Sequence, residues 1–256
     1  MDPSNGFTLV LPNHFTSEDY PKSIQTRVTA INDQTPPKTV GLYIAECGDS
    51  TCTHGFEYAG GHYSTVDFPG QPFNELLGQN NKGQAVGYYS TNQFGFGNAT
   101  DHAYIYDECG NRACTGPGVF ELLVIPDSSG GSQATGINDA GNVCGFYIDS
   151  HQAMHGFLLI SGTLEALDFP EPSATATAAF GLNNVGNVVG IYTDSIGSHG
   201  FVYTVSSKTW QTIDDPHAIV DGMQTTVVNG INDKGTLVGF FGTSPIDSGF
   251  VATPEK

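Results

Sequence analysis

Three side chains suited to acid–base or binding chemistry share one position in a sequence repeat. Arg27, Glu75 and Gln133 each stand three residues before the small residue that ends a predicted strand. A carboxyl can act as a general acid or base, and a guanidinium can stabilise developing negative charge or orient a polar ligand. The equivalent residues of later repeats are Ala178 and Val227. A wall that is half polar and half apolar is typical of a small-ligand pocket.

Aromatic and amide side chains extend this candidate site. Phe180 and Asn229 directly precede the small residue in their own repeats, and Phe94 and Phe96 stand between glycines in a long loop. The loop aromatics would cap a pocket or stack on sugar rings, or else pack the loop onto its own strands. The candidate ligand-binding set is therefore Arg27, Glu75, Gln133, Phe180, Asn229, Phe94 and Phe96, with Glu75 and Arg27 catalytic if the protein is an enzyme.

Four histidines and five asparagines recur at fixed positions. Imidazoles arranged around an axis could hold a metal, but a residue required in nearly every repeat usually satisfies that repeat's own backbone. We therefore expect structural histidines, turn-forming asparagines and no metal site. The recurring residues are His54, His102, His155 and His199, and Asn32, Asn80, Asn138, Asn183 and Asn232.

The asparagines mark five copies of one segment with a period of about 45–50 residues, which indicates a repeat architecture. Each copy contains four strand-like runs, with a turn such as Asn138 to Gly141 after the first and a His-Gly-Phe segment opening the third. Four antiparallel strands repeated radially form a β-propeller blade. We predict an all-β, five-bladed β-propeller with four-stranded blades, in which residues 1–256 form one domain.

The two ends of the chain suggest how the ring closes. The last copy stops after its third run, and residues 7–12 resemble the fourth run of the other copies. We predict that this N-terminal strand completes the last blade, since closure removes the free edges of an open sheet.

The repeated Ile-Asn-Asp-x-Gly-x-Val-Val-Gly and His-Gly-Phe segments resemble the HAF repeat, which is found in predicted extracellular bacterial proteins. His102-Ala103-Tyr104 and Ser248 depart from that pattern. The resemblance covers nearly the whole chain, and it implies an extracytoplasmic, propeller-like bacterial protein without a general assigned activity.

Charge and composition narrow the partners. The chain has 26 acidic and 8 scattered basic residues, so we expect repulsion from nucleic acid and anionic membranes. No apolar run is long enough for a membrane span, and the first residues lack the features of a signal peptide, as a mature secreted chain would. We expect a monomer without a cofactor, although a cation such as calcium suits the acidic surface.

Two cysteine pairs share the same spacing of five residues. Cys47 with Cys52, and Cys109 with Cys114, each lie in a loop rich in glycine and Asp or Asn. We predict two local disulfides, which indicate an extracellular or periplasmic location. Cys144 replaces a valine of the other repeats, so we expect a small buried apolar side chain.

The sequence thus favours an extracytoplasmic propeller that binds a small molecule or glycan at its axial face. One alternative is a catalytic propeller, a hydrolase or lyase resembling a glycosidase. Such an enzyme needs two carboxylates, and the inner strands clearly offer only Glu75. The other alternative is a structural or protein-binding surface protein.

Overall fold

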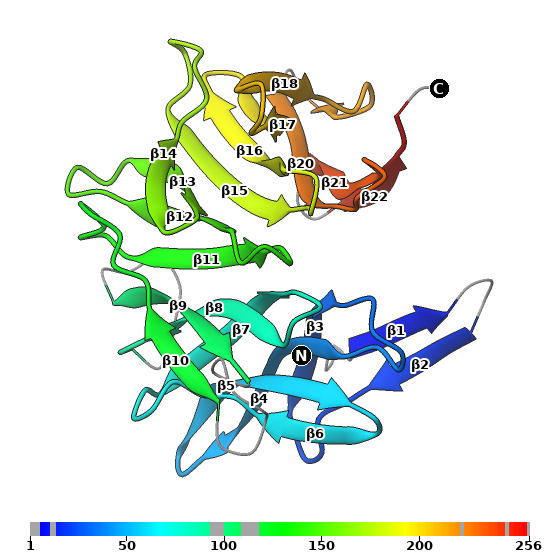
Figure 1. Ribbon diagram of the computed structural model, residues 1–256. Helices are drawn as coiled ribbons and strands as arrows, with labels where there is room; N and C mark the ends of the chain where they lie inside the picture. Colours follow the sequence, from blue (N-terminus) through cyan, green and yellow to red (C-terminus); the bar gives the residue numbers. More distant parts are fainter. Residues whose placement is uncertain are drawn as a thin grey trace. The chain divides into compact units, whose positions relative to one another are not determined.

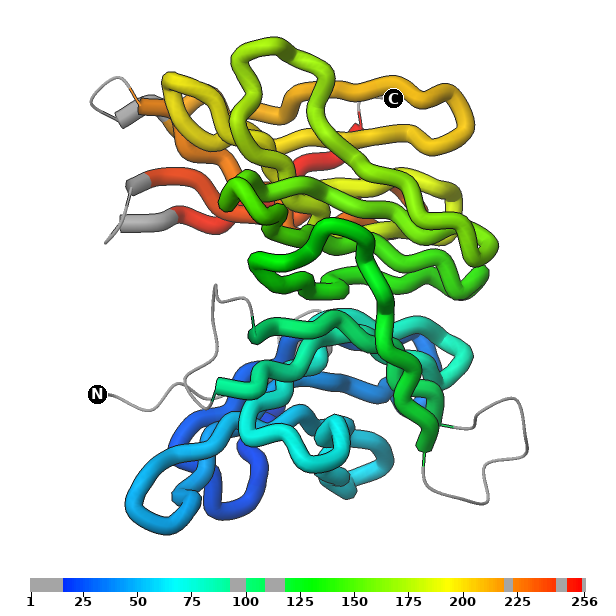
Figure 2. Tube along the Cα trace, turned by 90° about the vertical axis from the view of Figure 1, so that its left-hand side faces the viewer, coloured from blue at the N-terminus to red at the C-terminus, as the bar shows by residue number. Residues whose placement is uncertain are grey.

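The computed structural model describes residues 6–10, 14–92, 100–108, 118–220, 223–243 and 246–254. In this part of the chain all regular elements are β-strands, as the sequence predicts (Figure 1). The chain divides into two compact units, Met1–Val124 and Ile125–Lys256. Each unit consists of successive up-and-down passes of the chain (Figure 2).

The first unit contains a hairpin and two four-stranded repeats. The hairpin is β1 (Gly6–Val10) and β2 (His14–Glu18). The first repeat is β3 (Gln25–Ile31), β4 (Thr39–Cys47), β5 (Ser50–Ala59) and β6 (His62–Thr65). The second is β7 (Phe73–Gln79), β8 (Gln84–Ser90), β9 (Asp101–Asp107) and β10 (Val119–Leu122).

The second unit contains two four-stranded repeats and a three-stranded one. The third repeat is β11 (Ser132–Ile137), β12 (Val143–Ile148), β13 (Met154–Ile160) and β14 (Thr163–Leu167). The fourth is β15 (Ala176–Leu182), β16 (Asn187–Asp194), β17 (Gly197–Thr204) and β18 (Thr209–Ile213). The short β19 (Ile219–Val220) precedes the fifth repeat, β20 (Met223–Ile231), β21 (Leu237–Thr243) and β22 (Ile246–Ala252).

Every repeat has the same irregularity in its first strand. The pairing with the second strand shifts by one residue just before the small residue, for example between Leu76 and Gly78. This bulge pushes a carbonyl against the second strand, where a Cβ on Gly87 would overlap the Glu75 carbonyl oxygen. The glycine that follows the valine, or Cys144 in the third repeat, is therefore a steric requirement of the bulge.

The repeated asparagines cap the turn after the first strand, as predicted, and two of them, Asn138 and Asn183, also bond to the next repeat. The Asn183 Oδ1 accepts a bond of 2.8 Å from the backbone N–H of Asn187, and its Nδ2 donates to the Asn232 carbonyl at 3.0 Å. Asn138 makes the same contact to the Asn183 carbonyl at 3.1 Å. Gly141 has φ of +78°, which the turn requires.

The apolar core lies between consecutive repeats. One cluster joins the third and fourth repeats and includes Leu158, Phe169, Phe201 and the fully buried Cys144. The expectation of a small buried apolar role for Cys144 is confirmed. Because consecutive repeats within one unit bury their faces against each other, the contacts that matter for a site are those at the junctions inside a unit.

The N-terminal hairpin follows the pattern of a third and fourth strand. Gly6 pairs with Glu18 in β1–β2, just as Gly156 pairs with Leu167 in β13–β14. The described partner of β1 is thus β2, and β2 holds the position of a fourth strand. The single 1–256 domain, the number of blades and the closure of the ring by residues 7–12 stay predictions.

Candidate functional site

The same type of hydrogen bond recurs where the fourth strand of one repeat is followed by the first strand of the next. The backbone N–H of Phe169 donates to Thr177 Oγ1 at 3.0 Å, and that of Phe68 donates to Asn74 Oδ1 at 2.8 Å. Tyr20 makes the same bond to Thr26 at 2.9 Å. This hydrogen bond positions the Asp that directly precedes the aromatic residue, such as Asp168 before Phe169, at the start of the junction between the two repeats.

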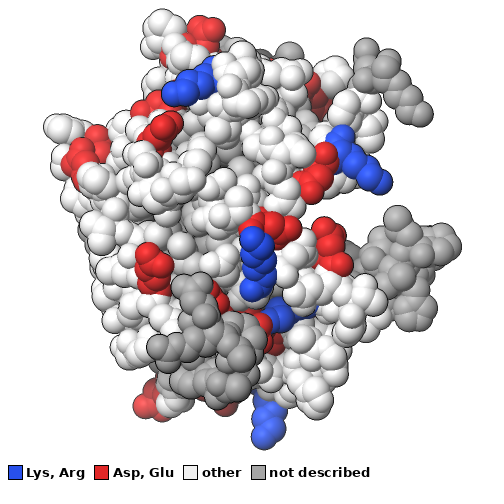
Figure 3. Space-filling view, in the orientation of Figure 1, with Lys and Arg blue, Asp and Glu red and all other residues white. Residues whose placement is uncertain are grey.

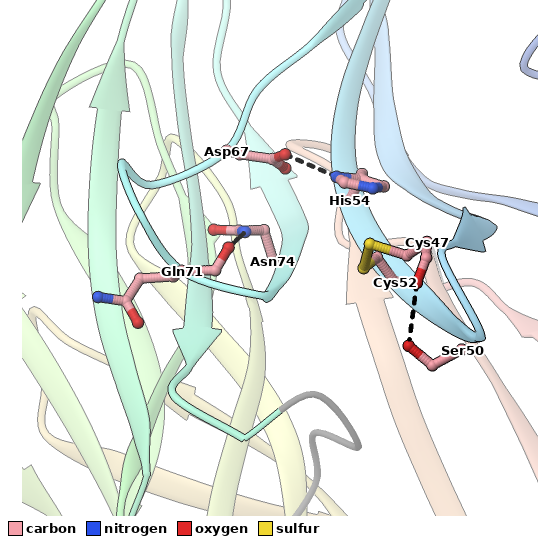
Figure 4. Close-up of a disulfide and its surroundings, with 7 residues drawn as sticks. All are labelled: Cys47, Ser50, Cys52, His54, Asp67, Gln71 and Asn74. Carbon is pink, nitrogen blue, oxygen red and sulfur yellow. Dashed lines mark hydrogen bonds and ion pairs between the residues drawn. A yellow bond between two sulfur atoms is a disulfide. The ribbon is translucent and has the colours of Figure 1, made fainter.

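That Asp binds the repeated histidine. The His54 Nδ1 lies 2.7 Å from Asp67 Oδ2, as Figure 4 shows, and His199 Nδ1 lies 2.9 Å from Asp214 Oδ2. The rings of His54, His155 and His199 also stack on the repeated tyrosine, with ring centroids 4.9 Å apart for Tyr43 and His54. These contacts lie within a repeat and support the structural role expected for the histidines. The described residues contain no group of three or more His, Cys, Asp or Glu side chains that could hold a metal.

Two junctions are closed by backbone pairing. Thr53 at the third strand of the first repeat pairs in parallel with Phe73 of the second repeat. Ser198 of the fourth repeat pairs in the same way with Thr225 of the fifth. Each of these short parallel bridges joins its two repeats into one eight-stranded sheet.

The junction between the third and fourth repeats lacks this bridge. Its equivalent residues are Met154 and Ala176, and no backbone pairing joins β13 to β15 within the described residues. β11–β14 consequently form a separate four-stranded sheet. Among the described residues, the start of β13 therefore lacks the parallel pairing that closes the other two junctions.

A pocket of about 190 Å³ occupies this open junction. Its lining combines polar and apolar side chains, which is the composition expected of a ligand site. It is lined by Met154, His155, Asp168, Phe169, Ala174, Thr175, Ala176 and Thr177. All of these residues belong to the second unit.

Charged groups converge on the polar side of the pocket. His155 Nδ1 lies 3.1 Å from both oxygens of Asp168, and its Nε2 lies 3.5 Å from Asp149 Oδ2. Burial acts to lower the pKa of His155, but hydrogen bonds and charges from Asp168 and Asp149 outweigh it, so that the pKa is raised. With a carboxylate at each ring nitrogen, the imidazole acts as a donor on both sides and is a poor general base.

The structure brings Arg27 and Glu75 together in the first unit. Glu75 pairs across the strands with Tyr88, whose ring is fully buried. Burial raises the pKa of Glu75 to about 7; the Arg27 charge and the Tyr88 hydroxyl oppose this shift, and the nearby Asp101 adds to it. A carboxyl that titrates near neutrality is suited to proton transfer.

The other candidates of the predicted axial arc lie in the second unit. Gln133 and Phe180 are half-buried and Asn229 is exposed. The ring of Phe180 packs edge-on against Phe146 of the preceding repeat, with centroids 6.4 Å apart. The arc that would join these residues to Arg27 and Glu75 stays a prediction. Phe94 and Phe96 lie outside the described residues.

One of the two predicted disulfides falls within the described residues. The Sγ atoms of Cys47 and Cys52 are bonded, and the bridge closes the hairpin between β4 and β5 (Figure 4). Cys109 and Cys114 lie outside the described residues, and Cys144 is free.

The sequence predicts basic residues that are scattered and do not cluster. In the view of Figure 3, Lys and Arg side chains lie singly among Asp and Glu, in agreement with this prediction. Among the described residues, no helix has the length and apolar character required to cross a membrane.

The sequence analysis missed the open junction and the His–Asp pairs. The pairs had a usable signal, because the repeats with Asp67, Asp168 and Asp214 also carry the histidine at the start of their third strand. The missing bridge had no such signal, because backbone pairing between repeats depends on their relative placement.

Comparison with known proteins supports the fold class. The structure resembles the fucose-specific lectin from Aleuria aurantia, at 12% identity and TM-score 0.48, over 94% of this chain and 83% of that chain. It also resembles a mutant of that lectin in complex with Fucα1-6GlcNAc, at 11% identity and TM-score 0.50, over 96% and 82% of the two chains. The second of these structures is a β-propeller lectin, and its likeness to this chain supports an all-β, propeller-like fold. No family model and no curated protein matches the chain, and the HAF resemblance therefore rests on its motif alone.

Proposed function

We propose that this protein binds carbohydrate, with the ligand in the open junction between the third and fourth repeats. The observation that carries the proposal is the pocket that stands where two other junctions have a parallel backbone bridge. Its volume of about 190 Å³ suits one sugar ring rather than an extended ligand. Asp168 offers acceptors for hydroxyl groups, and the exposed Thr175, whose hydroxyl donates to the Thr193 carbonyl, can still accept a further hydrogen bond. Met154 and Phe169 offer apolar surface.

The proposed ligand site lies at the junction between the third and fourth repeats, and not at the axial face that the sequence predicts. The junction residues line a pocket of about 190 Å³ within one unit, whereas the axial arc draws on residues of both units. The likeness to propeller lectins, one of them bound to a fucoside, agrees with a glycan as the ligand.

We further propose an extracellular or periplasmic location. The Cys47–Cys52 bridge supports it, because such disulfides persist in oxidising compartments. We also retain the proposal that the protein is a monomer that binds neither nucleic acid nor membranes.

The position of the single tryptophan provides the test. The ring centroid of Trp210 lies 5.2 Å from that of Phe169, which lines the pocket. We expect a glycan array to yield ligands and their titration to change Trp210 fluorescence. Fucosides, including Fucα1-6GlcNAc, are the first to test.

A pocket-filling variant tests the location. Ala176→Phe introduces the residue that the second repeat carries as Phe73 at the equivalent, closed junction. We expect this variant to fold with an unchanged melting curve and to lose binding. The proposal fails if no glycan binds the wild type, or if a folded Ala176→Phe variant binds as well as the wild type.

One observation favours a second candidate function, a hydrolase or lyase that uses Glu75. Its pKa of about 7 suits a general acid or base, and the Arg27 charge beside it would stabilise developing negative charge. If chromogenic glycosides are turned over, Glu75→Gln should slow the reaction about 10²–10⁴-fold, the usual share of a general acid or base. Turnover that this variant leaves unchanged would exclude Glu75 as the catalytic group.

A further inference from the structure

The carboxylate of Asp168 is held symmetrically at the edge of the junction pocket. Both of its oxygens lie 3.1 Å from the same His155 nitrogen. The other ring nitrogen of that histidine lies 3.5 Å from Asp149, which fixes the ring from behind. The Asp168 side chain remains 49% exposed, so its outer edge is accessible.

The geometry leaves a matched pair of acceptors on that outer edge. An ionised carboxylate has about four lone-pair sites, and the contact with His155 uses those on one side. The two remaining oxygen faces are equivalent because the histidine contact is symmetrical. Two hydroxyl groups on adjacent carbons of a sugar can each donate to one of these oxygens.

The charge balance of the pocket disfavours an anion. Asp149 and Asp168 carry two negative charges, which a protonated His155 offsets only in part. Among the residues that the structure describes, no Lys or Arg lines the pocket. The exposed Glu171 follows Asp168 on the connecting loop. A sugar carboxylate entering here would meet like charges without a cation to pair with.

Resting on the proposed carbohydrate-binding function, we infer that the pocket selects neutral sugars and holds a vicinal diol between the two oxygens of Asp168. The apolar side formed by Met154, Phe169 and Ala174 then faces the C–H surface of the ring. Uronic and sialic acids are excluded by the same carboxylate.

The chain supplies a matched control for the test. Asp214 makes the same contact with His199, at 3.1 and 2.9 Å, but lies at a junction closed by the Ser198–Thr225 bridge. Asp168→Asn and Asp214→Asn therefore remove equivalent structural contacts, and only the former changes the pocket. Melting curves and circular dichroism check that both variants are folded.

The probes are the neutral monosaccharide identified by the array, its two monodeoxy analogues that each lack one diol hydroxyl, and the corresponding uronic acid. We expect Asp168→Asn to weaken binding of the neutral sugar by about 10–100-fold, the usual effect of losing hydrogen bonds to a charged group, and Asp214→Asn to leave it within about twofold. Each deoxy analogue should bind the wild type more weakly by about tenfold or more, and the uronic acid should bind at least as poorly.

The possible outcomes distinguish a failure of this inference from a failure of the proposed carbohydrate binding. Unchanged affinity in folded Asp168→Asn, or a uronic acid that binds the wild type as well as the neutral sugar, overturns this inference and leaves carbohydrate binding intact. If Asp168→Asn does not fold, the test uses the affinity of the wild type for the two deoxy analogues. If both analogues bind as tightly as the parent sugar, the diol contact is overturned. A wild type that binds no glycan overturns the proposed function and the inference together.

Discussion

Glu75 should make the stability of this protein depend on pH. Its carboxyl is half-buried beside the fully buried Tyr88, and its pKa is raised from 4.5 to about 7, mainly by burial. The unfolded chain therefore releases the proton near its ordinary pKa, while the folded chain retains it until near neutrality. Ionisation of Glu75 consequently favours the unfolded state as the pH rises through this window.

The size of the effect follows from the two pKa values. Between about pH 5 and about pH 8, a group that moves from 4.5 to about 7 lowers the free energy of unfolding by about 2.5 kcal/mol. Glu75→Gln keeps the size of the side chain and removes the titration. We expect the stability of this variant relative to the wild type to rise by about that amount across the same range.

Urea denaturation followed by circular dichroism at several pH values measures this difference. Fluorescence is unsuitable, because Trp210 lies in the other compact unit. Glu121→Gln is the control, since Glu121 is an exposed glutamate of the same unit. A stability difference between Glu75→Gln and the wild type that stays flat from about pH 5 to about pH 8 would refute the burial argument.

Three further predictions follow from contacts in the structure. Because the pKa of His155 is raised in the fold, its contribution to stability is present below its ordinary pKa of 6.5 and is lost as the pH rises through the higher folded value; melting curves should show this loss, and His155→Gln should remove it. Asn183→Ala should cost about 1–3 kcal/mol in urea denaturation, because it breaks two bonds of a buried side chain; a cost near zero would contradict the role of the asparagine in joining repeats. Mass spectrometry without reductant should find Cys47 bonded to Cys52, while Cys144 is alkylated only after unfolding; rapid alkylation of Cys144 in the native protein would contradict its burial.

Some features of the site could be predicted from the sequence and others could not. The shared position of Arg27 and Glu75 was visible in the repeat, and the structure brings their charges together in one unit. The partner of Glu75 was not visible, because Tyr88 reaches it only through strand pairing across the bulge. Thr29 lies at the equivalent bulge of the first repeat, and its hydroxyl donates to the Leu76 carbonyl of the second repeat at 2.7 Å.

The length of the segment that connects two repeats does not predict which junction contains the pocket. The link from Asp168 to Thr177 is two residues longer than the equivalent link that begins at Asp67. The link after Asp214 is longer still, yet part of it forms β19, which pairs with β20, and that junction is closed. Length alone therefore does not distinguish an open junction from a closed one.

The sequence by itself determined the period of the repeat, the four strands within it, the asparagine turns and the spacing of Cys47 and Cys52. These features are local: hydrophobic alternation, turn chemistry and short loops act within one repeat, and repetition makes each of them visible several times. Only the tertiary structure decided that Ser198 pairs with the next repeat while the equivalent Met154 faces a pocket. That difference depends on how closely two whole repeats approach each other, which is set by the packing of side chains across the junction and has no local pattern in the chain.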